Sequence, residues 1–259
     1  VSFFAHNITE GFLAGYDHGK KAGTMHVANH HIVAGAKLWE WGPGAYGSMW
    51  DTRVLTDSDG PYAELMAGAY SDNQPDYSWL KPYEVKTFKQ YWYPMRNTGG
   101  AVTANLHGLL NLKEQNPKQI LVAANVTSEM QGVVLRLEHN DRILLERVID
   151  ISPANPFSET VALKQPLDFY QFNLSLKSSR GEELISYKPV KKQENLPLPE
   201  TVKPPLPPEK IATTEELYLT GLRIRQFYNA RLDATAYFLE ALRRDSLDTR
   251  SNNEMGLYH

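Results

Sequence analysis

Residues 60–94 decide the fold of this chain: Gly60-Pro-Tyr-Ala-Glu-Leu-Met-Ala-Gly-Ala-Tyr-Ser-Asp-Asn-Gln-Pro-Asp-Tyr-Ser-Trp-Leu-Lys-Pro-Tyr-Glu-Val-Lys-Thr-Phe-Lys-Gln-Tyr-Trp-Tyr-Pro94. Residues 62–69 alternate around one carboxylate, which predicts a strand. The Asp, Asn, Ser and Pro residues of positions 71–82 favour a loop, because these residue types punctuate regular structure. Residues 85–93 alternate again and are rich in aromatic and β-branched side chains, which predicts a second strand.

Glu64 is the first candidate for chemistry. A lone carboxylate in an apolar strand is costly to desolvate unless it meets partners or lines a cavity. Two interpretations stay open on spacing alone. Glu64 is either a functional acid or base, or it pairs with a core Arg or Lys.

The same stretch resembles the C-terminal signature of aldose 1-epimerases, in the galactose mutarotase-like superfamily. In that superfamily a strand Glu is the catalytic base, a loop rich in Pro, Asp and Asn follows, and the next strand opens with a Leu-x-Pro-Gly-Glu turn. Glu64 matches the base, residues 72–76 match the loop, and residues 80–84 match the turn, with Tyr83 where the family has Gly. The chain is more similar still to an uncharacterised bacterial branch, a domain of unknown function, in which a β-supersandwich precedes tetratricopeptide repeats.

The resemblance implies a carbohydrate-active or carbohydrate-binding protein of the epimerase or glycoside hydrolase type. Glu64 would be the general acid or base, with Glu84 and Asp51 as candidates for a second carboxylate. His18 is a candidate acid, because it lies in a Gly-flanked turn beside Asp17 and epimerases place a His opposite the Glu. A hydrolase needs two carboxylates about 5–10 Å apart. The residues leave epimerase, hydrolase and binding alone open.

Five residues are candidates for holding the sugar. All five Trp of the chain fall in its first hundred residues, a distribution typical of a thick sheet core or a ligand groove. Trp39 and Trp41 share one face of an alternating segment that ends in a glycine-rich turn, and we predict a core position for Trp41. The expected sugar contacts are Trp39, Trp50, Asp51, Asn73 and Gln74.

Composition restricts the partners. A net charge of −3 gives no reason to expect nucleic acid or an anionic membrane as a partner. No apolar run approaches the roughly 18 residues that span a bilayer. The absence of Cys excludes disulfides and Cys-based zinc sites. We expect neither a metal nor a cofactor, and His30 and His31, predicted to point to opposite faces of a strand, do not form a metal site by themselves.

We predict a mainly β chain in four parts. Residues 1–117 form the C-terminal portion of a mutarotase-like β-supersandwich, and residues 118–189 a small immunoglobulin-like β-sandwich, with strands at 120–126, 133–138, 143–149, 169–176 and 184–187. Residues 190–210 are a Pro-rich linker. Residues 211–259 begin a tetratricopeptide repeat array, because Leu217, Gly221, Ile224, Ala234, Phe238 and Ala241 follow the packing pattern of that repeat.

The first residue is Val1 rather than Met, so we expect a piece of a longer protein, with a repeat array that continues. The compartment, bacterial cytoplasm or periplasm, stays open. The alternative function is non-catalytic: a β module that presents a helical scaffold to protein partners. Glu64 discriminates between the two hypotheses, because an aromatic groove around it favours carbohydrate and a buried Arg or Lys pair favours the scaffold.

Overall fold

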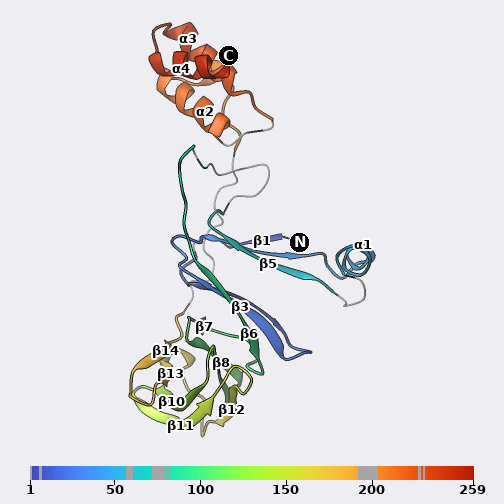
Figure 1. Ribbon diagram of the computed structural model, residues 1–259, viewed down its shortest axis with the longest axis vertical. Coiled ribbons are helices and arrows are strands. Elements are labelled where there is room, and N and C mark those ends of the chain that lie inside the picture. The colour runs from blue at the N-terminus through green and yellow to red at the C-terminus, as the bar shows by residue number, and fades with distance from the viewer. Residues whose placement is uncertain are drawn as a thin grey trace. The chain divides into compact units, whose positions relative to one another are not determined.

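The computed structural model describes residues 2–5, 8–56, 61–71, 80, 82–191, 203–226, 229 and 231–259. These residues are mainly β, and their strands form four antiparallel sheets. The chain divides into two compact units, residues 1–71 with 88–193 and residues 72–87 with 194–259. Figure 1 shows the strands and the C-terminal helices along the chain.

The first sheet, called sheet A here, has the strand order β1-β4-β5. Its strands are β1 (Ser2–Phe4), β4 (Gly35–Glu40) and β5 (Ala63–Gly68). The strand predicted for residues 62–69 is therefore confirmed. Strand β4 is the centre of the sheet, so each residue of β4 has a cross-strand neighbour on β5, and several also have one on β1.

The second sheet, called sheet B here, has the order β2-β3-β6. Its strands are β2 (Phe12–Asp17), β3 (Ala22–Ala28) and β6 (Gln90–Arg96). Gly15 and Gly23 pair inside β2 and β3, and Gly19 lies in the turn that connects the two strands. Strand β6 begins at Gln90 rather than at Val85, and residues 84–89 precede it without regular structure.

Sheet B uses its two faces differently. Met25 and Met95 point to one face and are fully buried with Leu109 of a later strand. The residues that alternate with these methionines along the strands point to the opposite face. On that face Gly15 lies against Leu65 of sheet A. A Cβ at position 15 would come within 2.9 Å of the Leu65 side chain, so the close approach of β2 to β5 requires a glycine.

A short helix follows β4, where the sequence predicts a glycine-rich turn. Helix α1 (Ala45–Trp50) runs directly into the π-helical turn η1 (Asp51–Leu55). Gly47 is buried against the backbone of Trp41 and Gly42, a contact that leaves no space for a side chain. The helix therefore folds back on the end of β4.

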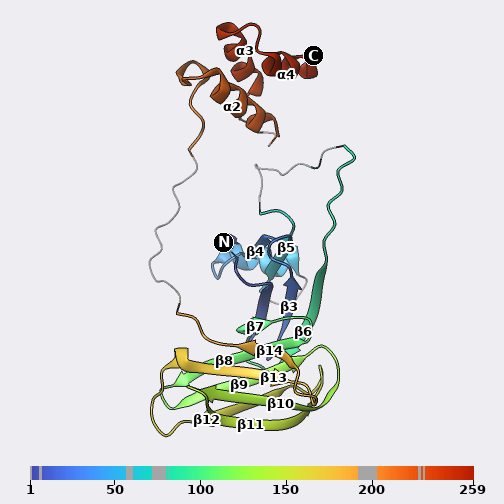
Figure 2. The same ribbon diagram turned by 90° about the vertical axis from the view of Figure 1, so that its left-hand side faces the viewer.

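Residues 103–187 form two four-stranded antiparallel sheets around a common core, which Figure 2 shows with both layers labelled. One sheet has the order β12-β9-β8-β7 and the other the order β11-β10-β13-β14. The core contains fully buried residues from both sheets, so the predicted two-sheet sandwich arrangement is present, and its immunoglobulin-like topology stays a prediction. The strands are β7 (Thr103–Ala104), β8 (Gly108–Asn116), β9 (Gln119–Val126), β10 (Met130–His139), β11 (Arg142–Ile151), β12 (Phe157–Ala162), β13 (Phe172–Lys177) and β14 (Glu183–Tyr187), with the 3-10 turn η2 (Phe169–Gln171) before β13.

The structure differs from the expected boundary at residue 117. Strands β7 and β8 pair with β9, so this two-sheet module begins at residue 103. The apolar run from Gly108 to Leu112 is buried throughout and forms the start of a central strand, β8. Strand β12, which the sequence analysis did not predict, pairs with β9 as an edge strand.

Helices occupy the C-terminal part, as predicted. After the 3-10 turn η3 (Pro208–Lys210) come α2 (Thr214–Gln226), α3 (Ala234–Arg244) and α4 (Thr249–Tyr258). Leu217, Gly221 and Ile224 of α2 are buried, and Phe238 and Ala241 of α3 are buried as well. The tetratricopeptide assignment itself stays a prediction. None of the helices that the structure describes is long and apolar enough to cross a membrane.

Candidate functional site

The pairing of β4 with β5 places Trp39 directly opposite Glu64. Residues opposite each other in an antiparallel pair have side chains on the same face, with Cβ atoms about 4.5–5.5 Å apart. The carboxylate of Glu64 is therefore a neighbour of the Trp39 indole, and both residues are half-buried. Two residues that the sequence analysis selected separately meet on one face.

Strand β1 and β4 extend this face with an aromatic ring and a cation. The rings of Phe4 and Trp39 meet edge to face, with centroids 6.1 Å apart. The Lys37 ammonium lies 5.4 Å from the centre of the Phe4 ring, in the geometry of a cation–π contact. Because Lys37 and Trp39 are two residues apart on one strand, both share the face of Glu64.

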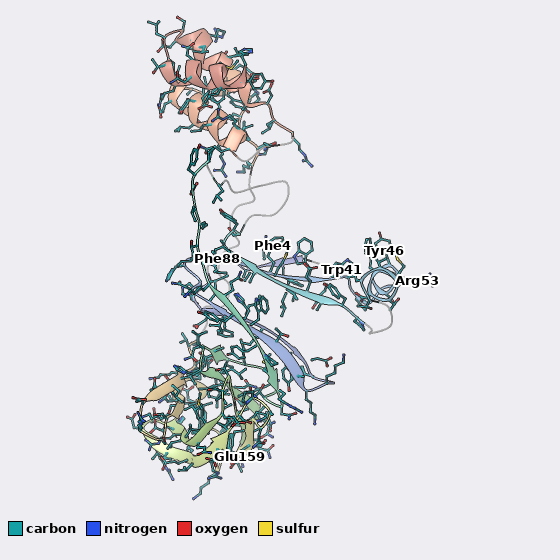
Figure 3. The ribbon with its side chains drawn as sticks, viewed as in Figure 1. Phe4, Trp41, Tyr46, Arg53, Phe88 and Glu159 are labelled. Carbon is teal, nitrogen blue, oxygen red and sulfur yellow. The ribbon has the colours of Figure 1, made fainter. Side chains whose placement is uncertain are left out.

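A second aromatic pair continues the face toward helix α1. Trp41 and Tyr62 follow the pair Trp39–Glu64 in the same alternation, and their ring centroids are 5.4 Å apart. Trp41 is half-buried rather than a core residue, which differs from the prediction. We call the set Phe4, Lys37, Trp39, Trp41, Tyr62 and Glu64 the aromatic face; Figure 3 labels Phe4 of β1 and Trp41, which follows the end of β4.

Asp51 borders the aromatic face from η1. Its side chain is buried, and its Oδ1 accepts a hydrogen bond of 3.2 Å from the backbone N–H of Tyr62. This bond fixes the start of β5 against the helical turn. Trp50, the residue before it, is half-buried and meets Tyr46 edge to face at 6.4 Å. Asp51 thus lies beside the aromatic face, with Trp50 next to it in the chain.

The surroundings of Glu64 differ from those of a structural ion pair. Among the residues that the structure describes, none gives the Glu64 carboxylate a hydrogen bond or a salt bridge. Several other carboxylates among the described residues are paired, for example Glu159 with Arg147 at 2.8 Å. Glu64 therefore retains the full hydrogen-bonding capacity of a carboxylate next to an indole.

Sheet A separates Glu64 from sheet B. Leu65 follows Glu64 and points to the opposite face, where it meets Gly15 of β2. Since successive side chains of a strand alternate between faces, Glu64 points away from sheet B. The structure does not bring His18, which lies at the β2–β3 turn of sheet B, to the aromatic face.

The carboxylate of Asp17 caps the turn that contains His18. Its Oδ1 accepts hydrogen bonds from the backbone N–H groups of Gly19, at 2.8 Å, and Lys20, at 3.0 Å. The bond from Lys20 is the main cause that holds the pKa of Asp17 below its usual value. The His18 ring is exposed and contacts Tyr16, with centroids 5.0 Å apart. Asp17 thus stabilises the turn instead of orienting an acid.

The other predicted site residues are placed elsewhere or are not described. Asn73 and Gln74 lie outside the described residues. Glu84 is exposed in residues 72–87, which belong to the compact unit that contains the helices. Its neighbour Tyr83 has a φ of 67°, in the left-handed region that favours glycine, and this is the position where the aldose epimerases have Gly.

Sequence reasoning missed His26, the buried histidine of the chain's first sheets. Its side chain is 4% exposed, and its Nε2 is 2.9 Å from the Gln90 Oε1. Burial lowers the pKa of His26, and the bond to Gln90 opposes this shift. Its alternation with apolar residues in β3 was the available signal. The expectation that His30 and His31 point apart is wrong, because both lie in a turn with ring centroids 4.0 Å apart.

The aromatic face has the components of a sugar site. Indole and phenyl rings stack on the C–H faces of pyranoses, and a carboxylate accepts hydrogen bonds from the hydroxyl groups of the sugar. Asp51 is hydrogen-bonded to Tyr62, and the Cα atoms of Tyr62 and Glu64 are about 7 Å apart along an extended strand. Within the ranges that the structure describes, no group of three His, Asp or Glu residues is arranged to hold a metal.

Two family matches agree with this division of the chain. Residues 3–95 match a domain of unknown function, DUF5107, and residues 103–187 match the second domain of YphG-like proteins. The first match contains sheets A and B with the aromatic face, and the second contains the two-sheet module. Each match covers less than half of the chain. No solved structure matches it.

Proposed function

We propose that the aromatic face binds carbohydrate and that Glu64 acts there as a general acid or base. The observation that supports this proposal most is the register of β4 and β5, which sets a half-buried carboxylate opposite Trp39. A carboxylate beside an apolar ring and without a cationic partner is the kind of group that enzymes use for proton transfer. The resemblance of residues 60–84 to the epimerase signature gives Glu64 the same role.

Asp51 is the second carboxylate of the proposal. It accepts a hydrogen bond from the backbone N–H of Tyr62, which lies two residues before Glu64. Carboxylates about 5–10 Å apart act together in glycosidases. An epimerase would need a histidine instead, and His18 does not lie on this face. We therefore favour a hydrolase-type or binding role over an epimerase role for the aromatic face.

The test compares four proteins on a glycan array and by calorimetry: wild type, Glu64→Gln, Trp39→Ala and Glu159→Gln. Glu64→Gln keeps the shape of the side chain and removes its charge, so a bound sugar should persist while its turnover stops. Glu159→Gln removes a carboxylate of the two-sheet module and should change neither property. Turnover that continues in Glu64→Gln would exclude the acid–base role.

A second proposal, a scaffold for protein partners, is favoured by the surface of the helices. Leu219, Leu239 and Leu257 of α2, α3 and α4 are each more than half exposed. The proposal takes these three leucines as the surface that a protein partner would cover. Loss of a protein partner from Leu219→Ser and Leu239→Ser variants, together with unchanged glycan binding, would show that both proposals hold for different parts of the chain.

A further inference from the structure

A proline-rich segment lies against helix α3. Residues 206–212, Leu-Pro-Pro-Glu-Lys-Ile-Ala, contain the 3-10 turn η3 and end just before α2. We call this segment the strap. Pro207 has a φ of −55° and a ψ of 147°, which is the extended conformation of polyproline. The strap and α3 belong to the same compact unit of the chain.

Two side chains of α3 hold the strap by its backbone carbonyl groups. The Tyr237 hydroxyl donates a hydrogen bond of 3.1 Å to the carbonyl oxygen of Leu206. The Arg244 guanidinium donates to three further carbonyl oxygens of the strap: Ile211 at 2.7 Å, Ala212 at 3.2 Å and Pro208 at 3.3 Å. Tyr237 and Arg244 are seven residues apart, so they lie on one face of α3, two turns from each other.

Glu240 orients the guanidinium of Arg244 for this contact. Its Oε1 accepts a hydrogen bond of 2.7 Å from the Nε of Arg244, one turn further along α3. This bond engages Nε and leaves the terminal nitrogens, Nη1 and Nη2, to donate to the strap. A donor that a residue of its own helix already orients loses less freedom when it binds an extended segment.

One side chain anchors the strap. Ile211 is 3% exposed and packs in a cluster with four buried residues of α2 and α3: Leu217, Ile224, Tyr237 and Ala241. Pro208 is half-buried, and the other five strap residues are exposed. The site therefore recognises a short pattern, in which two prolines keep the backbone extended and an aliphatic residue follows the second proline by three positions.

This mode of binding allows one segment to replace another. Hydrogen bonds to backbone carbonyl groups are available to any sequence that follows the same path. The prolines restrict the backbone before binding, so a proline-rich segment loses little conformational freedom at the site. Because Ile211 is the strap's only buried residue, displacing the strap uncovers one apolar side chain.

We propose that the face of α3 with Tyr237 and Arg244 is a recognition site for a proline-rich segment of a protein partner, and that the strap occupies this site within the chain. The partner segment carries the pattern Pro-Pro-x-x-Ile and displaces the strap. A tethered strap competes at an effective concentration on the order of 1 mM or more, so the partner binds weakly while the strap is seated. Neither residue belongs to the aromatic face or to the exposed leucines.

The test is complementation with a fluorescent peptide of residues 203–213. The proteins are wild type, Ile211→Ser, and Ile211→Ser combined with either Arg244→Gln or Arg243→Gln. Ile211→Ser removes the anchor of the strap and frees the site. Arg243→Gln is the matched control, because Arg243 bonds to Glu240 and donates to no strap carbonyl among the described residues. A second peptide carries Ser in place of the isoleucine.

Fluorescence anisotropy measures binding, and circular dichroism measures the thermal midpoint of the helices. The first peptide should bind Ile211→Ser about tenfold or more tightly than wild type, since the strap no longer competes. It should also raise the midpoint of that variant, or restore its helices if the substitution unfolds them, because a ligand of the folded state stabilises it. Adding Arg243→Gln should preserve both effects.

Adding Arg244→Gln, or using the serine peptide, should abolish binding and stabilisation. A peptide that neither binds Ile211→Ser nor stabilises it would overturn the proposal and leave the strap as a fixed part of the helical unit. Binding of equal strength to wild type and Ile211→Ser, or binding that persists with Arg244→Gln, would place the peptide elsewhere and overturn it as well.

Discussion

The two-sheet module of residues 103–187 and sheet A differ in how far their side chains are buried and paired. In the module, Leu135, Leu174 and Phe172 have no exposed surface, and charged residues on the outside form pairs such as Arg136 with Glu146. In sheet A, Phe4 is 41% exposed, and Glu64 has no ionic partner among the described residues. The module is therefore packed for stability, whereas sheet A exposes the aromatic ring and the unpaired carboxylate on which the proposed carbohydrate site rests.

The largest effect should come from matched phenylalanine substitutions in the two regions. Phe172→Ala creates a cavity in a filled core and should lower the free energy of unfolding by about 3–5 kcal/mol. Phe4→Ala removes a half-exposed ring and should cost less than about 1 kcal/mol. Chemical unfolding of both variants measures the contrast, and equal losses would show that sheet A is as tightly packed as the module.

Two glycines of the helices provide a similar comparison between a tightly packed and an open position. A Cβ at position 221 would come within 2.7 Å of the Phe238 ring, so Gly221→Ala should destabilise the helices by about 1–3 kcal/mol. A Cβ at position 256 meets nothing within 4 Å, and Gly256→Ala should stabilise α4 by about 0.5–1 kcal/mol. Thermal unfolding, followed by circular dichroism, shows whether each substitution raises or lowers the stability of the helices. A gain of stability in Gly221→Ala would contradict the packing of α2 on α3.

A smaller loss of stability is expected at the junction of sheet B with the two-sheet module. The Tyr93 hydroxyl donates to the carbonyl oxygens of Asn105 and Gly108, each at 3.0 Å, and burial raises its pKa. Tyr93→Phe should therefore cost about 1 kcal/mol in chemical unfolding. Tyr91→Phe is the control, since Tyr91 is exposed on the same strand. Equal effects would show that the junction bonds contribute nothing.

The smallest effect is a pH dependence that originates at His26. Burial holds the pKa of His26 below its usual value of 6.5, so the unfolded chain takes up a proton at a higher pH than the folded chain. Its contribution to stability is complete above about pH 6.5 and is lost as the pH falls toward the folded pKa. Thermal midpoints should drop more steeply between about pH 7 and pH 5 in wild type than in His26→Gln. Parallel curves in the two proteins would exclude His26 as the source of the pH dependence.

The sequence predicted the elements of the site better than their arrangement. Alternation identified the strand that carries Glu64, and composition selected Trp39, but their meeting depends on the register of β4 with β5, which local pattern does not define. Helix α1 was missed because glycine and proline precede it and resemble a turn. His26 was missed because its partner Gln90 lies 64 residues away in the chain. Strand β8 could not be assigned from the sequence, because a short buried apolar run has no diagnostic period.

Calorimetry of one glycan with three proteins tests the central claim most directly: wild type, Trp39→Ala and Tyr170→Ala. Tyr170 is 41% exposed on the two-sheet module and serves as a matched aromatic control. Loss of a stacking ring from the centre of a site costs more than about 1.4 kcal/mol, so Trp39→Ala should weaken binding at least tenfold, while Tyr170→Ala binds as wild type does. A glycan that binds wild type and Trp39→Ala with equal affinity would contradict the assignment of the aromatic face as the carbohydrate site.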